Sequence, residues 1–173
     1  MRHRLSTLLL LLAAGLLRAQ SSGAFLQAFP ALPDHGLKDQ VDGRAGLGLA
    51  GGWWSENDSL PFRARVLVQA WPSGSVRGLP GATSKVTNAA FTFELASLAS
   101  PRSRFYGAVG LGADHWIVER PGAPTGRTTH LCGVGAIGYR FPSGLFLELG
   151  DKRGAFFHGT EAGTTYLSAG FRF

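Results

Sequence analysis

Apolar and polar residues alternate with a period of two along most of the chain, from about residue 44 to the C-terminus. The clearest case is the final segment, in which one face carries Thr165, Leu167, Ala169, Phe171 and Phe173. Successive side chains of a β-strand point to opposite faces of a sheet, so this period indicates strands rather than helices. We therefore predict an all-β fold.

The polar faces of the alternating segments consist mainly of glycine, alanine and a few charged residues. The pattern covers residues 44–54, 62–71, 89–97, 104–118, 128–141, 145–152 and 164–173. In a soluble β-sandwich, the polar face would meet water and carry many Lys, Glu and Thr residues. Small residues and a few charges instead suit the narrow interior of a small barrel whose aliphatic face meets lipid. We expect such a barrel and keep a secreted sandwich as the alternative.

Charged residues on the polar faces would lie inside this barrel, where an unpaired charge is costly. We therefore predict that Glu94 and Glu148 pair with basic residues of other strands. The predicted lumen charge network comprises Arg63, Arg65, Glu94, Arg140, Glu148, Lys152 and Arg172. A lumen filled in this way would not support general diffusion.

The connections between the segments alternate between short and long. Residues 55–60, 98–103 and 142–144 are short connections, whereas residues 72–84, 119–127 and 157–163 are longer and rich in Gly, Pro and Thr. This order matches the short periplasmic turns and longer outer loops of outer-membrane barrels, with the C-terminus on the periplasmic side.

One more strand is needed, because single-chain bacterial barrels usually have an even number. Our candidate is residues 22–32, followed by an outer loop over residues 33–42. Its alternation is poor, and Pro30 lacks the backbone N–H that a closed barrel needs away from its rim. The alternative is that residues 20–42 form an irregular periplasmic or plug segment. With this first strand, the prediction is an eight-stranded antiparallel up-and-down transmembrane β-barrel.

The first residues have the three-part layout of a secretion signal. A basic start, Arg2-His-Arg4, precedes the apolar run Leu8–Leu17 and the small residue Ala19. We predict a signal peptide over residues 1–19 and an outer-membrane β-barrel domain over residues 20–173; a retained anchor helix is the alternative. Loss of the signal removes three arginines and no acidic residue, so the formal net charge falls from +6 to +3.

Composition narrows the chemistry further. The 25 glycines disfavour a helical fold, because Gly weakens a helix interior by about 1 kcal/mol. The single cysteine, Cys132, rules out an internal disulfide and a Cys-rich metal site, and we expect it to face the lumen. The basic surplus forms no block with interleaved aromatic residues, so we expect no nucleic-acid partner.

The end of the chain, Tyr166-Leu-Ser-Ala-Gly-Phe-Arg-Phe173, resembles the C-terminal signal that small outer-membrane barrels present to the barrel-assembly machinery. Residues 44–173 resemble the OmpA, OmpX and opacity-protein group, to which the segments 105–112 and 133–141 are also similar. The resemblance implies location in the outer membrane of a Gram-negative bacterium and contact with its lipid. The assembly signal that it implies comprises Tyr166, Leu167, Phe171 and Phe173. Such barrels include anchors, adhesins, small pores and enzymes.

Aromatic residues gather near the predicted strand ends. The outward-facing ones that suit a girdle at the level of the lipid headgroups are Trp53, Phe105, Tyr139 and Phe141. Packing in the core of a soluble protein is the alternative for these residues.

Several motifs suggest chemistry but lack the context that it needs. Gly46-x-Gly-x-x-Gly51 and Gly133-x-Gly-x-x-Gly138 match the dinucleotide fingerprint, yet neither precedes a helical pattern. Asp114 and His115 are adjacent on a predicted strand, so they point to opposite faces and do not form an acid–base couple. Lipid A deacylases are barrels with a His and Ser set near the C-terminus, where this chain has His158-Gly-Thr160.

No metal site or other cofactor is expected. The histidines that could gather near the outer rim are His35, His115, His130 and His158, but none has the paired spacing of a metal site. We therefore expect a non-enzymatic, monomeric outer-membrane protein with a structural or surface-interaction role, whose surface partner the sequence does not identify. The alternatives are a narrow transport barrel for a small solute and, after it, a lipid-modifying enzyme.

Overall fold

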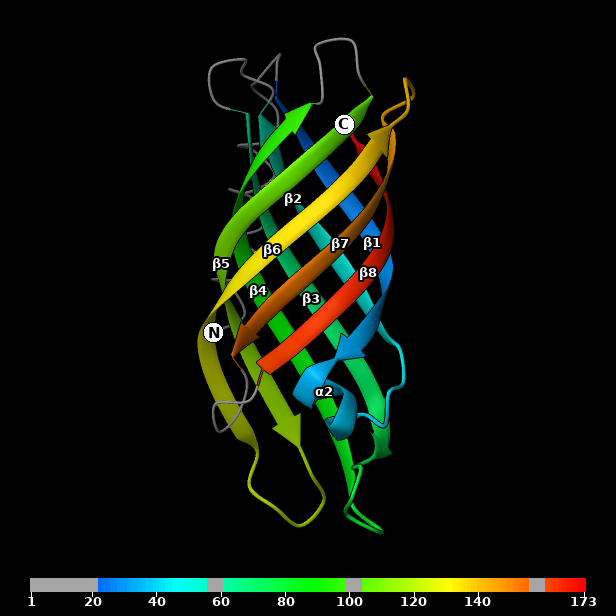
Figure 1. Ribbon diagram of the computed structural model, residues 1–173, viewed down its shortest axis with the longest axis vertical. Helices are drawn as coiled ribbons and strands as arrows, with labels where there is room; N and C mark the ends of the chain where they lie inside the picture. The colour runs from blue at the N-terminus through cyan, green and yellow to red at the C-terminus, as the bar shows by residue number, and fades with distance from the viewer. Residues whose placement is uncertain (1–21, 56–60, 99–103, 156–160) are drawn as a thin grey trace, which may run out of the picture.

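The chain forms a closed β-barrel of eight strands in which each strand is antiparallel to its neighbours (Figure 1). The computed structural model describes residues 22–55, 61–98, 104–155 and 161–173. The strands follow in chain order and β1 pairs with β8, which gives the predicted up-and-down topology. The elements are β1 (Ser22–Asp34), α2 (His35–Gln40), β2 (Gly46–Ser55), β3 (Phe62–Ser75), β4 (Thr83–Leu98), β5 (Phe105–Glu119), β6 (Gly126–Arg140), β7 (Leu145–Ala155) and β8 (Glu161–Arg172).

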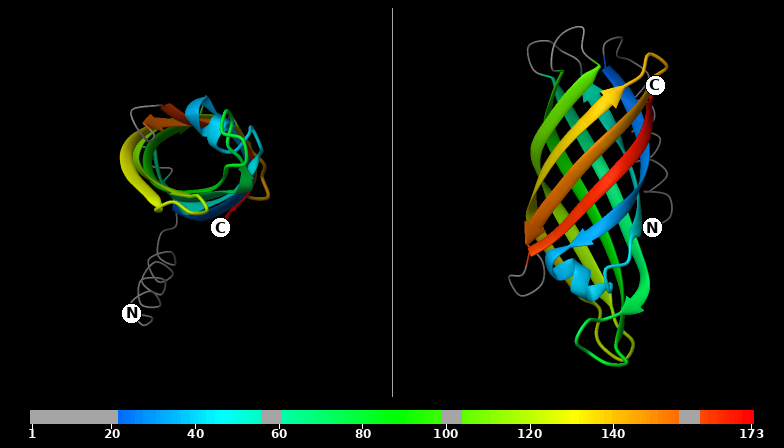
Figure 2. Two further views of the ribbon diagram at one scale, coloured as in Figure 1. Left: turned by 90° about the horizontal axis from the view of Figure 1, so that it is seen from below. Right: turned by 45° about the vertical axis from the view of Figure 1, so that its right-hand side comes forward.

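The two ends of the barrel differ in their connections. The C-terminus lies at one end, and α2 and the β3–β4 and β5–β6 hairpins lie at the other (Figures 1 and 2). We call the first the periplasmic end and the second the outer end, following the order of short and long connections. Among the described residues, no helix is long and apolar enough to cross a membrane. The predicted signal peptide lies outside the described residues.

The additional strand that the even strand number requires is β1 (Ser22–Asp34), the first in chain order. It is two residues longer than expected. It pairs with β2 from Ser22 to Ala31. Its pairing with β8 omits Phe29 and Pro30 between Ala28 and Ala31, at the place where the missing proline N–H interrupts the ladder. The closed barrel therefore tolerates this proline within a strand, which we did not expect from the sequence.

The expected loop over residues 33–42 contains a short helix, α2. The side chain of Asp34 caps it by accepting a hydrogen bond from the backbone N–H of His35 at 2.8 Å. Leu37 is its buried residue, and Val41 follows it as a second buried residue. A helix of six residues presents too little of the helical period to be read from sequence.

Alternation places one face of every strand in the lumen and the other on the outside. Exposed aliphatic side chains cover the outer surface, including Leu47, Leu111, Leu131 and Ile137, each more than 60% exposed. Lumen glycines often face an aromatic ring directly across the ladder: Gly138 pairs with Tyr106 and Gly150 with Tyr166. A Cβ atom on either glycine would lie 2.2 Å from Cζ of that tyrosine. The glycines therefore make room for the rings that fill the lumen.

Candidate functional site: the lumen and its two ends

The periplasmic half of the lumen contains two arginines and two glutamates, which we call the arginine layer: Arg63, Arg65, Glu94 and Glu148. Both arginines come from β3, and the glutamates come from β4 and β7; none is more than 1% exposed. Arg63 Nε donates to Glu94 Oε2 at 2.9 Å, and its Nη1 donates to Glu148. Arg65 Nη1 donates to Glu148 Oε1 at 2.9 Å, and its Nη2 lies 2.8 Å from Glu94 Oε1. Each carboxylate is therefore shared by both guanidinium groups.

Three hydroxyl groups complete the arginine layer. Thr92 Oγ1 donates to Glu94 Oε1 at 2.7 Å. The Tyr106 hydroxyl donates to Glu148 Oε2 at 2.8 Å, and the Tyr166 hydroxyl donates to Glu148 Oε1 at 3.2 Å. These bonds satisfy carboxylate lone pairs that the arginines leave open, as a buried ion pair requires. Sequence reasoning did not assign the tyrosine hydroxyls to this layer, although both tyrosines alternate in phase with lumen positions.

A second polar group, the lysine layer, lies nearer the outer end. Lys152 Nζ donates to Asp114 Oδ2 at 2.8 Å and to Asn88 Oδ1 at 3.0 Å, and it lies 4.6 Å from the centroid of the Trp116 ring. Lys152 and Asp114 are almost completely buried. Lys152, a member of the predicted lumen charge network, is therefore buried in the lumen, but its carboxylate partner is Asp114 and not one of the two glutamates. On the sequence alone, Asp114 is considered only beside His115.

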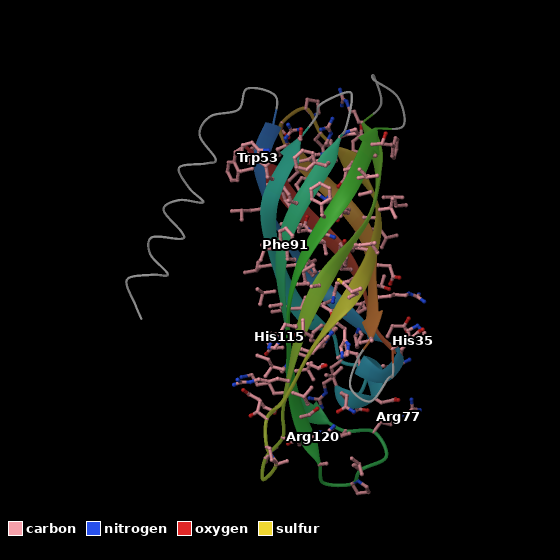
Figure 3. The ribbon with its side chains drawn as sticks, turned by 90° about the vertical axis from the view of Figure 1, so that its left-hand side faces the viewer. His35, Trp53, Arg77, Phe91, His115 and Arg120 are labelled. Atoms are coloured by element: carbon pink, nitrogen blue, oxygen red, sulfur yellow. The ribbon has the colours of Figure 1, made fainter. Side chains whose placement is uncertain are left out.

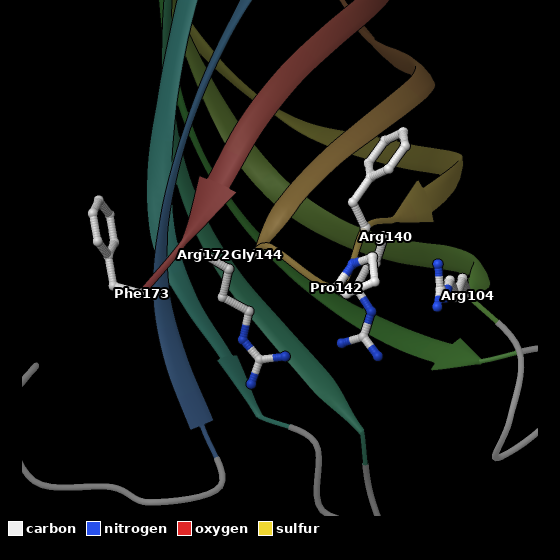
Figure 4. A pocket seen from close by; sticks show the side chains of 7 residues that line it. Arg104, Arg140, Pro142, Gly144, Arg172 and Phe173 are labelled. Atoms are coloured by element: carbon white, nitrogen blue, oxygen red, sulfur yellow. The ribbon is translucent and has the colours of Figure 1, made fainter.

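Two of the predicted lumen charges lie at the periplasmic mouth rather than in either layer. Arg140 and Arg172 line a cavity of about 450 Å³ together with Arg104 (Figure 4). The guanidinium Cζ atoms of Arg140 and Arg172 lie 5.3 and 5.9 Å from the centroid of the Trp54 ring. These two arginines therefore stack on the Trp54 ring at the solvent-facing mouth of the barrel.

Apolar side chains fill the outer end of the lumen beneath α2. We call the helix together with these side chains the α2 cap. Leu37 and Val41 are fully buried in one cluster with Trp71 and Trp116, whose rings stack with centroids 6.1 Å apart. Seen along the barrel axis, α2 lies at the rim of this end (Figure 2). Ser84 of β4 donates to the backbone oxygen of Gln40, which fastens the helix to the wall.

Residues of the two outer hairpins form hydrogen bonds to α2. Arg120 Nη2 donates to Gln40 Oε1 at 2.6 Å, and the backbone N–H of Arg77 donates to the backbone oxygen of Asp39 at 2.8 Å. Figure 3 places His35, Arg77 and Arg120 together at the outer end, far from Trp53. The β3–β4 and β5–β6 hairpins are therefore coupled to the cap through α2.

The predicted girdle residues lie on the outside at the periplasmic end. Phe105 and Phe141 are 63% and 37% exposed, and Trp53 and Tyr139 are half-buried. Phe105 and Tyr139 are cross-strand partners with ring centroids 4.9 Å apart, and Phe141 packs on Tyr139 at 5.0 Å. Of the predicted assembly signal, Leu167, Phe171 and Phe173 face outward, whereas Tyr166 faces the lumen. The roles of both sets remain predictions.

Within the described part of the chain, the candidate catalytic and metal-binding side chains do not come together in one site. Asp114 faces the lumen, whereas His115 is on the outer face, where its Nδ1 lies 2.8 Å from Thr129 Oγ1. Among the residues that the structure describes, no three His, Cys, Asp or Glu side chains gather as metal ligands. His158 and Thr160 lie outside the described residues. Both glycine motifs lie within strands, β2 and β6, and Cys132 is buried on the lumen face.

Comparison with known proteins identifies the fold. No protein-family model matches the chain, and no curated protein matches it. The chain is similar in structure to Ail, the attachment invasion locus protein of Yersinia pestis, with 12% identity over 88% of this chain and 97% of Ail, at a TM-score of 0.56.

Two further structures agree. The N-terminal β-barrel domain of Pseudomonas aeruginosa OprF gives 14% identity over 90% of this chain and all of that domain, at a TM-score of 0.57. A major outer membrane protein from Thermus thermophilus gives 11% identity over 89% of this chain and 100% of that one, at a TM-score of 0.60. The fold is thus that of the small outer-membrane barrels, as the C-terminal strand predicted.

Proposed function

Taking an eight-stranded barrel of the outer membrane as the premise, we propose that this chain is a non-conducting, non-enzymatic protein with a structural or surface-interaction role. The observation that carries the proposal is the double closure of the lumen. The arginine layer crosses its periplasmic half, and the α2 cap with the stacked Trp71 and Trp116 fills its outer half. A barrel of this size has an interior that side chains fill.

The arginine layer opposes transport for an energetic reason as well as a steric one. An ion or solute passing Arg63 and Arg65 would have to separate them from Glu94 and Glu148. Separating a fully buried ion pair leaves uncompensated charges, which typically costs about 3–5 kcal/mol for one partner. Repeating this cost at every passage disfavours the narrow transport barrel that the sequence left open.

The outer hairpins support a surface role. β3, β4 and β5 continue to Ser75, Thr83 and Glu119, and their hairpins carry charged side chains that face solvent. Lys85 and Glu119 form an exposed ion pair at 3.4 Å, and Arg77 lies 3.7 Å from Asp39 of α2. Charged hairpins held by a rigid barrel form a defined surface for a partner outside the cell.

Conductance measurements test the proposal. The purified full chain is reconstituted into planar bilayers, and its folded state is verified by the mobility shift between unboiled and boiled samples. We expect no stepwise conductance from the folded protein. The positive control combines Arg63→Ser and Glu94→Ser with replacement of residues 35–40 by a Gly-Ser linker, and this variant should conduct. Stepwise conductance of the unmodified protein at neutral pH would overturn the proposal.

A further inference from the structure

Three arginines line the cavity at the periplasmic mouth, and none of the described residues that line it is acidic. Arg104 directly precedes β5, whereas Arg140 and Arg172 end β6 and β8. Figure 4 shows the side chains of Arg140 and Arg172 extending beyond the strand ends. Arg104 is exposed and the other two are half-buried, so a ligand at the mouth has access to all three.

The arginine layer balances its own charges and not those of the mouth. Its two glutamates are already shared by its two arginines. Arg140 and Arg172 have other contacts, including the Trp54 ring. A guanidinium group carries several N–H donors, so an anion can be a further partner of each one. The positive lining of the cavity therefore favours an anionic ligand.

Two phenylalanines of the lipid-facing surface line the same cavity. Phe141 is 37% exposed and Phe173 is 70% exposed. Phe141 packs on Tyr139 with ring centroids 5.0 Å apart. Phe173 packs on Phe171 at 5.3 Å. Aromatic residues on the outside of a strand end suit the level of the lipid headgroups. The cavity therefore borders both the charged mouth and the lipid.

The turn between β6 and β7 forms the rim between these two surfaces. Its residues Pro142 and Gly144 line the cavity. The N–H of Arg172 donates to the backbone oxygen of Gly144 at 2.9 Å, and a Cβ atom on Gly144 would lie 2.7 Å from the backbone oxygen of Arg172. Gly144 has a φ of +88°, a left-handed conformation that glycine adopts readily. The turn therefore packs closely on β8, and Gly144 contributes no side chain that could close the cavity toward lipid.

We propose that the mouth cavity binds an anionic phospholipid of the periplasmic leaflet, with the phosphate at the arginines and an acyl chain along Phe141 and Phe173. Guanidinium groups match the oxygens of a phosphate group, and basic pockets at a membrane surface bind anionic headgroups. The cavity of about 450 Å³ lies within the usual range of ligand pockets, about 300–1,000 Å³. A free phosphate ion would use the arginines but leave the phenylalanines without a role. The combination of both groups in one cavity therefore favours the lipid.

Native mass spectrometry of the folded full chain in detergent tests the site, with dioleoylphosphatidylglycerol as the probe. One variant combines Arg104→Gln, Arg140→Gln and Arg172→Gln. The matched control removes the same charge at the outer end through Arg44→Gln, Arg77→Gln and Arg127→Gln. Loss of one basic residue near the headgroup should weaken binding roughly fivefold, so we expect about a hundredfold loss in the mouth variant. The control should bind the lipid as the unmodified protein does, and heat-modifiable mobility verifies that each barrel is folded.

A second pair of variants separates a lipid from a free anion without changing any charge. Phe105 and Phe141 both pack on Tyr139, with ring centroids 4.9 and 5.0 Å apart, but of the two it is Phe141 that lines the cavity. Phe141→Ser should therefore weaken lipid binding and Phe105→Ser should not, and equimolar inorganic phosphate should not displace the lipid. Absence of lipid binding, equal losses in the two arginine variants, equal losses in the two serine variants, or displacement by phosphate would overturn the proposal.

Discussion

The two polar layers of the lumen solve the same problem in different ways. In the arginine layer, Glu94 and Glu148 each contact both Arg63 and Arg65, so four charges form one closed set. In the lysine layer, Lys152 has one carboxylate partner, Asp114, and relies on the Asn88 amide and the Trp116 ring for its other contacts. The two layers therefore differ in how many cations each carboxylate contacts. We expect this connectivity, rather than the number of charges, to decide how much stability is lost when one carboxylate is removed.

The chemistry of the cations sharpens this contrast. A guanidinium group stays protonated inside a protein, whereas a buried lysine can release its proton and become neutral. Loss of one carboxylate therefore leaves the arginine layer with an excess charge that it cannot discharge. The lysine layer can respond to the same loss by proton release. We expect matched amide substitutions to affect the two layers unequally.

The largest effect is expected from Glu148→Gln. The substitution keeps the size of the side chain but leaves two arginines with only Glu94, and it weakens the bonds from Tyr106 and Tyr166. Breaking a fully buried ion pair by removing one partner typically costs about 3–5 kcal/mol, so we expect a loss in this range. Urea unfolding of the barrel in lipid vesicles, followed by tryptophan fluorescence, measures it. An unfolding free energy within error of the unmodified protein would refute the shared-carboxylate account.

Sequence reasoning found the members of the arginine layer but not how they are joined. Period-two alternation places Arg63, Arg65, Glu94 and Glu148 on lumen faces, and burial requires them to pair. Which carboxylate meets which arginine depends on the register around the closed barrel, and no local pattern encodes that register. The structure supplies it by pairing Arg63 with Glu94 across β3 and β4.

The parts that the sequence did not predict share a physical cause. The Lys152–Asp114 pair joins β7 to β5, two strands apart, so neither residue signals the other along the chain. The helix α2 is too short to form alone and depends on the apolar contacts of Leu37 with the lumen residues. In both cases, contacts between distant segments determine the local structure.

Asp114→Asn tests the lysine layer as the counterpart of Glu148→Gln. Lys152 keeps its bond to Asn88 and its contact with the Trp116 ring, and it can become neutral. A hydrogen bond to a charged group contributes about 1.5–3 kcal/mol, and we expect a loss in the lower part of this range. The same urea titration gives the comparison directly. A loss equal to or larger than that of Glu148→Gln would contradict the difference between the layers.

Gly150→Ala reaches the arginine layer without touching a charge. The added Cβ would lie 2.2 Å from Cζ of Tyr166, so the ring must shift and its hydroxyl bond to Glu148 must lengthen. Overpacking of this kind costs about 1–3 kcal/mol. We expect a smaller loss than for Glu148→Gln because all four ion pairs of the arginine layer remain. The matched control is Gly133→Ala, where the added atom meets nothing within 4 Å and stability should be nearly unchanged. Equal losses for both alanines would show that ring displacement is not the cause.

Ser84→Ala should have the smallest effect on overall stability, but its location makes it informative. It removes the hydroxyl that fastens the backbone oxygen of Gln40 to β4, on the outer side of the lysine layer. One neutral hydrogen bond contributes about 1 kcal/mol, which corresponds to roughly fivefold faster amide exchange if it acts through local opening. Hydrogen–deuterium exchange of the Val41 and Gly43 amides, which bond to Leu37 and Lys38, measures this opening. Arg63 bonds to Glu94 and Glu148 and not to α2, so we expect its amide exchange to stay unchanged. Faster exchange at both sites would mean that the α2 cap and the arginine layer open as one unit.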